Sequence, residues 1–366
     1  MNVENKLSYD DITIVPEAFT TILSRKECDP YINDMLPIFT APMDTVVNEF
    51  NYQLFLENRI NPVIPRTVDY DTRIKLFNEG KVFVAFSIKE SLSLNLGPIY
   101  NIPTDKQYKL CIDLANGHMT SLLALVKDFK TKYNNNIIIM TGNIANPNAY
   151  KLYDDVGVDF CRCGIGGGEG CLTSSNLGIH YPYFSLLKEI YDIKNSIHGK
   201  CKVIADGNIR GYCDIQKALI NADYVMIGGL LNRCIESAAP AIYGLSYFKF
   251  KYFKIINPFK TLFTYGRIIN PNKYKKVAKQ FKNGIIDIWK PFYGMSTKVA
   301  QAKMGNTTLK TSEGIIKRNK VKYSLSSWVE NETDYLRSAM SYTDSRTLKE
   351  YKEASWVKIN MLRFNK

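Results

Sequence analysis

A glycine-rich segment that ends in a cysteine is the part of this sequence best suited to chemistry. Residues 164–173 read GIGGGEGCLT, with five glycines in the seven residues before Cys171. Glycines permit positive φ and let backbone N–H and carbonyl groups converge on an ion or a ligand. A thiol among such backbone dipoles is favoured as the nucleophilic thiolate. We therefore predict a partly exposed, nucleophilic Cys171, with the Thr173 hydroxyl close to it.

The remaining cysteines and the histidines carry no comparable signal. A free cysteine usually packs as a small buried apolar side chain, and no CxxC pair or Cys–His metal pattern occurs, so we predict no zinc site. His118 either touches a ligand or lies in solvent. The residues expected to be buried thiols are Cys28, Cys111, Cys161, Cys163, Cys201, Cys213 and Cys234, and the other histidines are His180 and His198.

Composition indicates an ordinary globular protein of the cytoplasm. The chain has 366 residues, of which 45% are hydrophobic and 23% charged. It contains no apolar run near the roughly 20 residues that cross a bilayer, and its N-terminus does not resemble a signal peptide. Free thiols fit a reducing compartment. The net charge of +13 suggests an anionic partner, although an AT-rich genome would also enrich lysine.

Eight short apolar segments alternate with stretches of helix length. Strands that are apolar on both faces are typical of buried parallel sheets, and the alternation indicates βα units. Eight consecutive units predict a (β/α)₈ TIM barrel, with an open doubly wound sheet as the alternative. The predicted strands are 36–41, 61–64, 81–88, 108–113, 136–140, 158–163, 202–206 and 223–228.

Polar and glycine-rich motifs collect immediately after these strands. Parallel strands place their carboxyl ends at one face of a barrel, and this face carries the active site in barrel enzymes. We therefore expect the motifs to surround a single site. They are APMDT, DLANGH, GNIANP, GIGGGEGCLT, ADGNIR and GGLL.

Two segments fall outside the βα rhythm of what we expect to be one catalytic domain, residues 1–366. The first, about 240–286, is an aromatic and basic insertion; residues 237–286 contain ten Lys or Arg and no Asp or Glu. It could bind nucleic acid by stacking and phosphate contacts, pack on another subunit, or form a lid. We favour the last two because the spacing matches no nucleic-acid module. The second, about 297–312, is a polar segment expected to be a short mobile flap.

Nine motifs in the same order resemble the family of IMP dehydrogenases and GMP reductases. The resemblance covers nearly the whole chain apart from residues 240–275. It implies a barrel enzyme, usually a homotetramer, in which a cysteine attacks C2 of a purine nucleotide. The motifs are YDD (9–11), APMDTV (41–46), DLANGH (113–118), TGN (141–143), GIGxGxxCxT (164–173), ADGxIR (205–210), MIGGLL (226–231), FYGMS (292–296) and SEG (312–314).

The resemblance also implies roles for individual residues. Cys171 would be the nucleophile, and Thr173 with Glu313 would relay protons at the purine. Backbone carbonyls of Gly166, Gly168 and Cys171 would hold a potassium ion. Asp206 would bind the ribose, and Gly207, Gly228, Gly229 and Tyr293 the phosphate. Met295, Ser296, Glu313 and Gly314 would face the base, and Gly294 would also contact the substrate. Asp113, Asn116 and Gly117 would approach a nicotinamide cofactor. No separate regulatory (CBS-type) domain is expected.

Within the family, the segment between Ser296 and Glu313 favours the reductase. The dehydrogenase uses an Arg–Tyr pair on a long flap to activate water, whereas this segment is short and contains neither residue. Loss of a general base typically costs 10²–10⁴-fold in rate. The resemblance then implies NADPH-dependent conversion of GMP to IMP and ammonia. The alternatives are an NAD-dependent IMP dehydrogenase and a degenerate barrel that binds nucleotides without turnover.

Three residues depart from the family pattern near the substrate. Glu169 stands where the family commonly has a phosphate-binding serine, and a carboxylate about 4 Å from a phosphate costs several kcal/mol. It must turn outward, be neutralised by a basic group, or accompany a different substrate. Asn208 replaces a glycine beside the phosphate, and Lys310 stands where reductases tend to have an arginine near the base. These changes predict an altered phosphate site.

Overall fold

The structure, a computed structural model, contains the predicted closed barrel. It describes residues 5–96, 107–245, 267–268, 279, 281–284, 286–305, 308–309 and 311–359. Each predicted apolar run supplies one parallel strand. The strands are β2 (Ile38–Thr40), β3 (Val63–Ile64), β4 (Phe83–Phe86), β5 (Tyr108–Asp113), β6 (Ile137–Ile144), β7 (Phe160–Cys163), β8 (Lys202–Asp206) and β9 (Tyr224–Ile227).

Hydrogen bonds between the first and second barrel strands close the ring. The sheet order is β2-β9-β8-β7-β6-β5-β4-β3. The Thr40 amide donates to the Asn61 carbonyl at 2.9 Å, and the Asn61 amide donates to the Ile38 carbonyl at 3.0 Å. These two bonds join β2 to the residues just before β3. The closed ring excludes the open doubly wound sheet.

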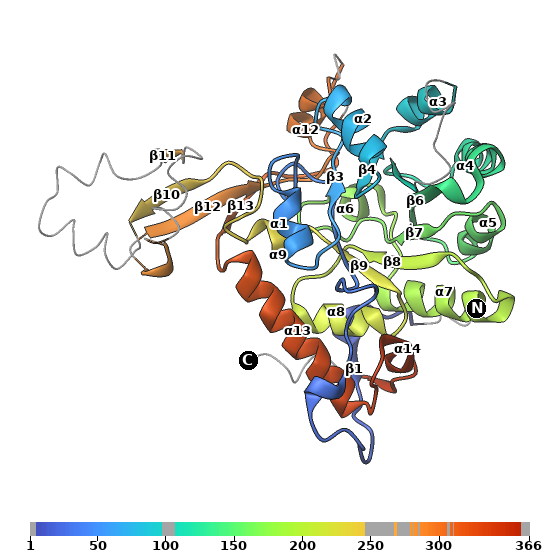
Figure 1. Ribbon diagram of the computed structural model, residues 1–366, viewed down its shortest axis with the longest axis vertical. Coiled ribbons are helices and arrows are strands. Elements are labelled where there is room, and N and C mark those ends of the chain that lie inside the picture. Colours follow the sequence, from blue (N-terminus) through green and yellow to red (C-terminus); the bar gives the residue numbers. More distant parts are fainter. Residues whose placement is uncertain are drawn as a thin grey trace, which may run out of the picture.

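Helices cover the outside of the barrel, as the alternating pattern predicted (Figure 1). Apolar residues of the helices and the outward faces of the strands form one large core between the two layers. The outer helices are α1 (Tyr52–Glu57), α2 (Tyr70–Glu79), α3 (Ile88–Leu96), α4 (Thr120–Tyr133), α5 (Ala149–Asp155), α7 (Tyr183–Ile197), α8 (Tyr212–Leu219) and α13 (Leu325–Tyr342).

Inward-facing side chains fill the barrel with an aromatic floor. The rings of Phe39, Phe83 and Phe160 lie 5.5–5.7 Å apart, and Tyr224 packs on Phe39 at 5.1 Å. Successive residues of a strand point to opposite faces, so Arg162 of β7 faces inward like Phe160. Arg162 lies two residues nearer the carboxyl end of β7. It therefore sits above this floor, at the face where the polar motifs gather.

The region expected to be an insertion begins and ends in paired strands. β10 (Ile242–Leu245) pairs antiparallel with β12 (Ile286–Phe292), and the sheet order β11-β10-β12-β13 adds Arg267–Ile268 and Lys317–Lys320. Figure 1 shows these strands extending from one side of the barrel. Buried Lys290 of β12 anchors them by donating to the Ser237 carbonyl at 2.7 Å and the Ile235 carbonyl at 2.8 Å. Most of the predicted insertion lies outside the described residues.

The segment expected to be a loop begins with a helix. α12 (Lys298–Lys303) follows Thr297, whose hydroxyl caps the Ala300 amide. A threonine N-cap before the run KVAQAK favours helix, a signal that our sequence prediction did not weigh. Residues 308–309 and 311–312 of the expected flap are described without regular structure.

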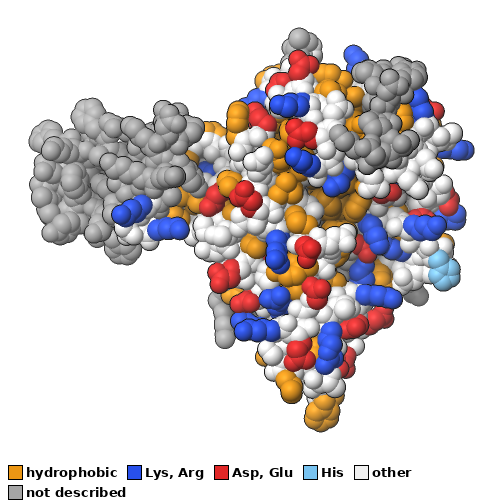
Figure 2. All heavy atoms as spheres, viewed as in Figure 1, with side chains coloured by type: hydrophobic (Ala, Val, Ile, Leu, Met, Phe, Trp, Pro, Cys, Tyr) orange, Lys and Arg blue, Asp and Glu red, His pale blue; other side chains and the backbone are white. Residues whose placement is uncertain are grey.

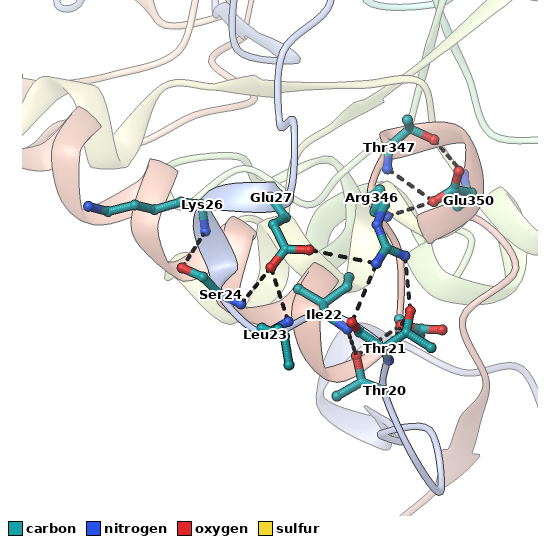
Figure 3. Close-up of polar contacts among 11 residues, drawn as sticks. Thr20, Thr21, Ile22, Leu23, Ser24, Lys26, Glu27, Arg346, Thr347 and Glu350 are labelled. Atoms are coloured by element: carbon teal, nitrogen blue, oxygen red, sulfur yellow. Dashed lines mark hydrogen bonds and ion pairs between the residues drawn. The ribbon is translucent and has the colours of Figure 1, made fainter.

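The two ends of the chain are joined below the barrel. β1 (Ile12–Ile14) pairs antiparallel with β14 (Trp356–Lys358). Figure 3 shows Arg346, which precedes α14 (Leu348–Tyr351), pointing toward Thr21 and Glu27 of the N-terminal segment. Its guanidinium donates to the Thr21 hydroxyl at 3.1 Å and lies 3.6 Å from the Glu27 carboxylate. These exposed contacts fix the N-terminal segment to the C-terminal one.

Charge on the described surface is mixed. Figure 2 shows Lys and Arg side chains interspersed with Asp and Glu over the visible face of the barrel. The acid-free segment 237–286 lies largely outside the described residues, so its proposed contacts with nucleic acid or a subunit stay predictions. None of the helices in the described part of the chain has both the length and the apolar character needed to cross a membrane.

The buried carboxyl group of Glu332 in α13 should make the stability of the protein depend on pH. Its side chain has no exposed surface, and the Gln216 side-chain amide of α8 approaches Glu332 Oε1 at 3.4 Å. Glu332 Oε2 and Gln216 Oε1 have no partner within the described protein. Burial raises the pKa of Glu332 well above its ordinary value, although the bond from Gln216 lowers it in part. A protonated Glu332 carries no charge, so its burial costs less than that of the carboxylate.

We expect the free energy of unfolding to fall between pH 5 and pH 8 because of Glu332. The folded state holds a proton that the unfolded state loses above its ordinary pKa, so raising the pH favours unfolding. Glu332→Gln should flatten this slope in urea titrations at both pH values. Glu330→Gln, at an exposed position of the same helix, is the matched control. Equal slopes for wild type and Glu332→Gln would contradict the assignment.

Candidate active site

A cavity of about 330 Å³ opens at the carboxyl ends of the barrel strands. This volume is at the lower end of the range for small-molecule sites. Its lining comes from the segments after β2, β3, β5, β7, β8, β9 and β12, so the predicted convergence of the motifs is observed. The predicted site residues that line it are Asp113, Gly166, Gly168, Cys171, Thr173, Asp206, Gly207, Asn208, Gly228, Gly229, Gly294, Met295, Ser296 and Glu313.

Cys171, Thr173 and Glu313 form a hydrogen-bonded row in this cavity. The Cys171 thiol donates to Thr173 Oγ1 at 3.2 Å, and the Thr173 hydroxyl donates to Glu313 Oε2 at 3.0 Å. Cys171 is partly exposed, as predicted. A nucleophile, a hydroxyl and a carboxylate in this order can pass a proton from sulfur to oxygen and return it to a bound molecule.

Backbone pairing brings Glu313 to the cysteine loop from 140 residues away in sequence. The Leu172 amide donates to the Glu313 carbonyl at 2.7 Å, and the Ile315 amide donates to the Gly170 carbonyl at 2.9 Å. A Cβ on Gly314 would lie 3.0 Å from that Gly170 oxygen. Gly314 is therefore needed for the close approach of the two segments, and it does not line the cavity.

Tyr183 of α7 lies under the glycine-rich loop and explains several of its glycines. Its hydroxyl accepts from the Gly167 amide at 3.1 Å and donates to the Asp206 carbonyl at 3.3 Å. A Cβ on Gly164 or Gly167 would lie 2.2 or 2.3 Å from the Tyr183 ring. These two glycines are thus required by packing, and Tyr183 is a site residue that sequence reasoning missed.

Buried Arg162 joins two carboxylates to which the resemblance gave separate roles. Its guanidinium contacts Asp113 Oδ1 at 2.6 Å and Asp206 Oδ2 at 2.8 Å. Asn143 of β6 also donates to Asp206 Oδ2, at 2.8 Å. Burial opposes the charge, but Asp206 and Asp113 outweigh it and hold the pKa of Arg162 above its ordinary value. Arg162 and Asn143 were missed because their carboxylate partners come from other strands.

The three residues expected near the cofactor lie in different environments. Asp113 lines the cavity, whereas Asn116 and Gly117 do not. A Cβ on Gly117 would lie 2.8 Å from the Asn143 carbonyl, so this glycine serves packing. His118 does not line the cavity and is exposed in a loop, which agrees with the second of the two expectations, and its Nε2 accepts from the Ala145 amide at 3.0 Å.

Arg66, which follows β3, adds positive charge beside Asp113. It lines the cavity, and one of its guanidinium nitrogens lies 3.4 Å from the Asp113 carbonyl. Its Nε is buried without a partner in the described protein. The guanidinium gives this side of the cavity a positive charge, which favours an acidic or phosphate-bearing ligand.

The expected phosphate end of the cavity contains an ion pair. Glu169 lines the cavity, so it does not turn outward, and its Oε1 accepts from Arg233 Nη2 at 2.8 Å. Of the three possibilities raised from the sequence, neutralisation by a basic group is the one observed. Asn208 has φ +56°, a region that Asn tolerates better than most residues, and accepts from Arg210 Nη2 at 2.6 Å.

Tyr293 does not face the cavity as expected. Its hydroxyl donates to Asp44 Oδ2 at 2.8 Å and accepts from Lys303 of α12 at 2.8 Å. The neighbouring Ser296 does line the cavity, and Gln301 of α12 holds its carbonyl at 2.8 Å. Lys310, expected near the base, lies outside the described residues.

The carbonyls expected to hold potassium have the right chemistry but already accept protein hydrogen bonds. The Gly166 carbonyl accepts from the Ser174 hydroxyl at 3.0 Å, and the Gly168 carbonyl accepts from the Cys171 amide at 2.9 Å. A carbonyl oxygen has two lone pairs, so each can also contact an ion. Uncharged oxygen donors of this kind suit a monovalent cation. The loop therefore fits a potassium site.

All the other thiols except one are buried, as predicted. Cys213 of α8 is exposed, which corrects that expectation. It occupies the second position of an amphipathic helix whose buried face begins at Asp214. Among the described residues, no three His, Cys, Asp or Glu side chains are arranged to hold a metal ion.

The fold and the cavity define a (β/α)₈ barrel with a cysteine-centred site at its strand ends. Residues 102–285 match the family model of the IMP dehydrogenase / GMP reductase domain. The GMP reductase of Staphylococcus saprophyticus is 30% identical over 253 residues, covering 64% of this chain and 73% of that protein. The GMP reductase of Bacillus licheniformis is 29% identical over 259 residues, covering 66% and 75%. The chain belongs to the IMP dehydrogenase / GMP reductase family and is most like the GMP reductases.

Proposed function

We propose that this protein is an oxidoreductase that converts GMP, or a related guanine nucleotide, to IMP and ammonia with NADPH. The observation that carries the proposal is the row Cys171–Thr173–Glu313 inside the cavity. The similarity to GMP reductases supports the reaction class. A row of thiol, hydroxyl and carboxylate supplies the nucleophile and the proton path that replacement of an amino group at C2 requires.

The chain's own residues account for the covalent and proton-transfer steps. Cys171 Sγ bonds to C2 of the guanine, and Thr173 passes the thiol proton to Glu313. Glu313 then returns a proton through Thr173 to the amino group, and the C2–N bond breaks to release ammonia. The product is a thioimidate in which C2 remains bonded to sulfur. After C2 is reduced, the C2–S bond breaks, IMP forms and sulfur leaves as the Cys171 thiolate, which takes up a proton from solvent to restore the thiol.

The ligands implied by the family fit separate parts of the cavity. The reduced nicotinamide cofactor, when bound, supplies the hydride that C2 accepts. Asp113 and Arg66 would contact it, since both line the cavity on the same side. Potassium would be held by carbonyls of Gly166, Gly168 and Cys171 and would stiffen the cysteine loop. We expect a cytoplasmic homotetramer, which native mass spectrometry can check.

A spectrophotometric assay tests the reaction and its alternatives. In potassium buffer, we expect NADPH absorbance to fall only when GMP is added. An IMP dehydrogenase would instead produce NADH from IMP and NAD. Neither signal from folded protein would support a barrel that binds nucleotides without turnover. NADH in place of NADPH tests the cofactor preference.

Breaking the row at its centre should slow turnover without unfolding the protein. Thr173→Val keeps the shape of the side chain but removes the hydroxyl that links sulfur to Glu313. We expect kcat to fall about 10²-fold, the usual scale for lost proton transfer. Thr173→Ser retains the hydroxyl and should recover most of the rate. Equal rates for Thr173→Val and wild type would show that the row does not move protons.

A further inference from the structure

The Glu169–Arg233 ion pair places a carboxylate in the wall of the cavity. Glu169 Oε1 lies 2.8 Å from Arg233 Nη2, and the two side chains are only 21% and 20% exposed. The other carboxylate oxygen approaches the backbone of α9 (Gly229–Asn232), because a Cβ on Gly229 would lie 3.0 Å from it. Glu169 lines the cavity, whereas Arg233 does not. The carboxylate therefore stands between Arg233 and the cavity.

The other cationic groups around this end are already engaged. Arg162 is held by Asp113 and Asp206 at the centre of the cavity. Arg210 contacts Asn208 and lies 3.2 Å from Asp10. Lys303 is paired with Asp44 and Tyr293. Arg162 is held by two lining carboxylates, whereas the ion pair of Arg233 is with a single lining carboxylate, Glu169, which a ligand's anion can replace.

We propose that Arg233 is the phosphate-binding residue and that Glu169 occupies its place until a nucleotide binds. The inference rests on the proposed function for the identity of the base but concerns a different part of the cavity. A phosphate cannot bind Arg233 while the Glu169 carboxylate remains there, because like charges repel at this distance. It can replace the carboxylate, because a guanidinium binds phosphate oxygens through two parallel N–H donors.

The residues beside Glu169 allow its side chain to move away from Arg233. On one side Gly170 is fixed by the Ile315 amide at 2.9 Å, whereas on the other side a Cβ on Gly168 would meet nothing closer than 3.4 Å. The Glu169 side chain can therefore rotate away from Arg233 on the Gly168 side with little steric cost. Glu169 thus competes with the substrate phosphate for Arg233. The contact with Arg233 favours nucleotides over nucleosides, and the displacement of Glu169 lowers the affinity for the nucleotide.

Calorimetric titration of the full-length protein with GMP and with guanosine tests this exchange without depending on turnover. We expect wild type to bind GMP at least about 10-fold more tightly than guanosine. Arg233→Met should weaken GMP binding about 30-fold, the scale of a charge-assisted hydrogen bond, and leave guanosine unchanged. Glu169→Gln removes the competing charge and should strengthen GMP binding about 10-fold, again without affecting guanosine.

Two further variants separate this role from general effects on the fold. Arg233→Lys keeps the charge and should restore part of the preference for GMP. Glu189→Gln breaks an ion pair of the same 2.8 Å length, to Lys6, outside the cavity, and should change neither affinity. Guanosine binding as tightly as GMP would overturn the inference, as would equal weakening of both ligands by Arg233→Met or weaker GMP binding to Glu169→Gln. Absence of GMP-dependent NADPH oxidation would instead refute the proposed reaction. The affinities for GMP and guanosine could still be compared in each variant.

Discussion

Replacing Cys171 by serine is expected to reduce GMP-dependent NADPH oxidation by about 10³-fold or more, because the side chain that bonds to C2 is lost. A serine hydroxyl is a far weaker nucleophile, although it can still hydrogen-bond to Thr173. Because Cys171 is only partly buried and a serine hydroxyl can keep the hydrogen bond to Thr173, stability should change little. Steady-state kinetics and thermal unfolding of the same sample separate the two effects.

Cys213→Ser is the matched control for this prediction. Cys213 is the exposed thiol of α8 and does not line the cavity, so the variant should retain wild-type kcat. Comparable activity in Cys171→Ser and wild type would remove the proposed nucleophile. Comparable losses in both cysteine variants would point to a general effect of thiol replacement.

Arg162→Met is expected to lower the free energy of unfolding by about 3–5 kcal/mol and to abolish substrate binding. The variant leaves Asp113 and Asp206, at 11% and 13% side-chain exposure, without the cation between them. Removing one member of a buried ionic group typically has this cost. Arg162→Lys should recover only part of the stability, because an ammonium cannot reproduce the fork that contacts both carboxylates.

Urea unfolding at pH 7 measures the effect of Arg162. Arg25→Met breaks an exposed ion pair with Asp334, with side-chain exposures of 49% and 43%, and should change stability by less than about 1 kcal/mol. If Arg162→Met unfolds with no smaller free energy than Arg25→Met, the ion pairs of Arg162 with its two aspartates do not stabilise the fold. Loss of GMP binding without loss of stability would assign Arg162 directly to the ligand.

The barrel strands and the cysteine loop could be predicted because each is marked by residues that lie close together in the sequence. Each buried strand is a largely apolar run, and the polar motifs lie at or just after the ends of the strands. Cys171 and Thr173 are two residues apart, so their proximity could be expected from the sequence. The place of Glu313 required the family resemblance, since only backbone pairing with Leu172 and Gly170 brings it to the cysteine.

The features that sequence reasoning missed are decided by tertiary neighbours. Arg162 interrupts the apolar run VDFCRC, and a charge inside a buried strand does signal a paired acid nearby. The sequence could not show that both Asp113 and Asp206 would supply that pair. The Tyr293 hydroxyl donates to Asp44, a carboxylate 249 residues away in the sequence. Arg233 could not be matched to Glu169 before α9 was placed beside the cysteine loop.

The most direct test of the central claim is covalent labelling with a purine ribonucleotide that carries a halide at C2. A thiolate at the proposed position should displace the halide and leave one nucleotide bonded to Cys171. Peptide mass spectrometry should find this adduct in wild type, and excess GMP should prevent it. Exposed Cys213 reports nonspecific reactivity in the same sample. Modification of Cys213 with Cys171 left unmodified would contradict the claim that the Cys171 thiol reaches C2 of a bound purine.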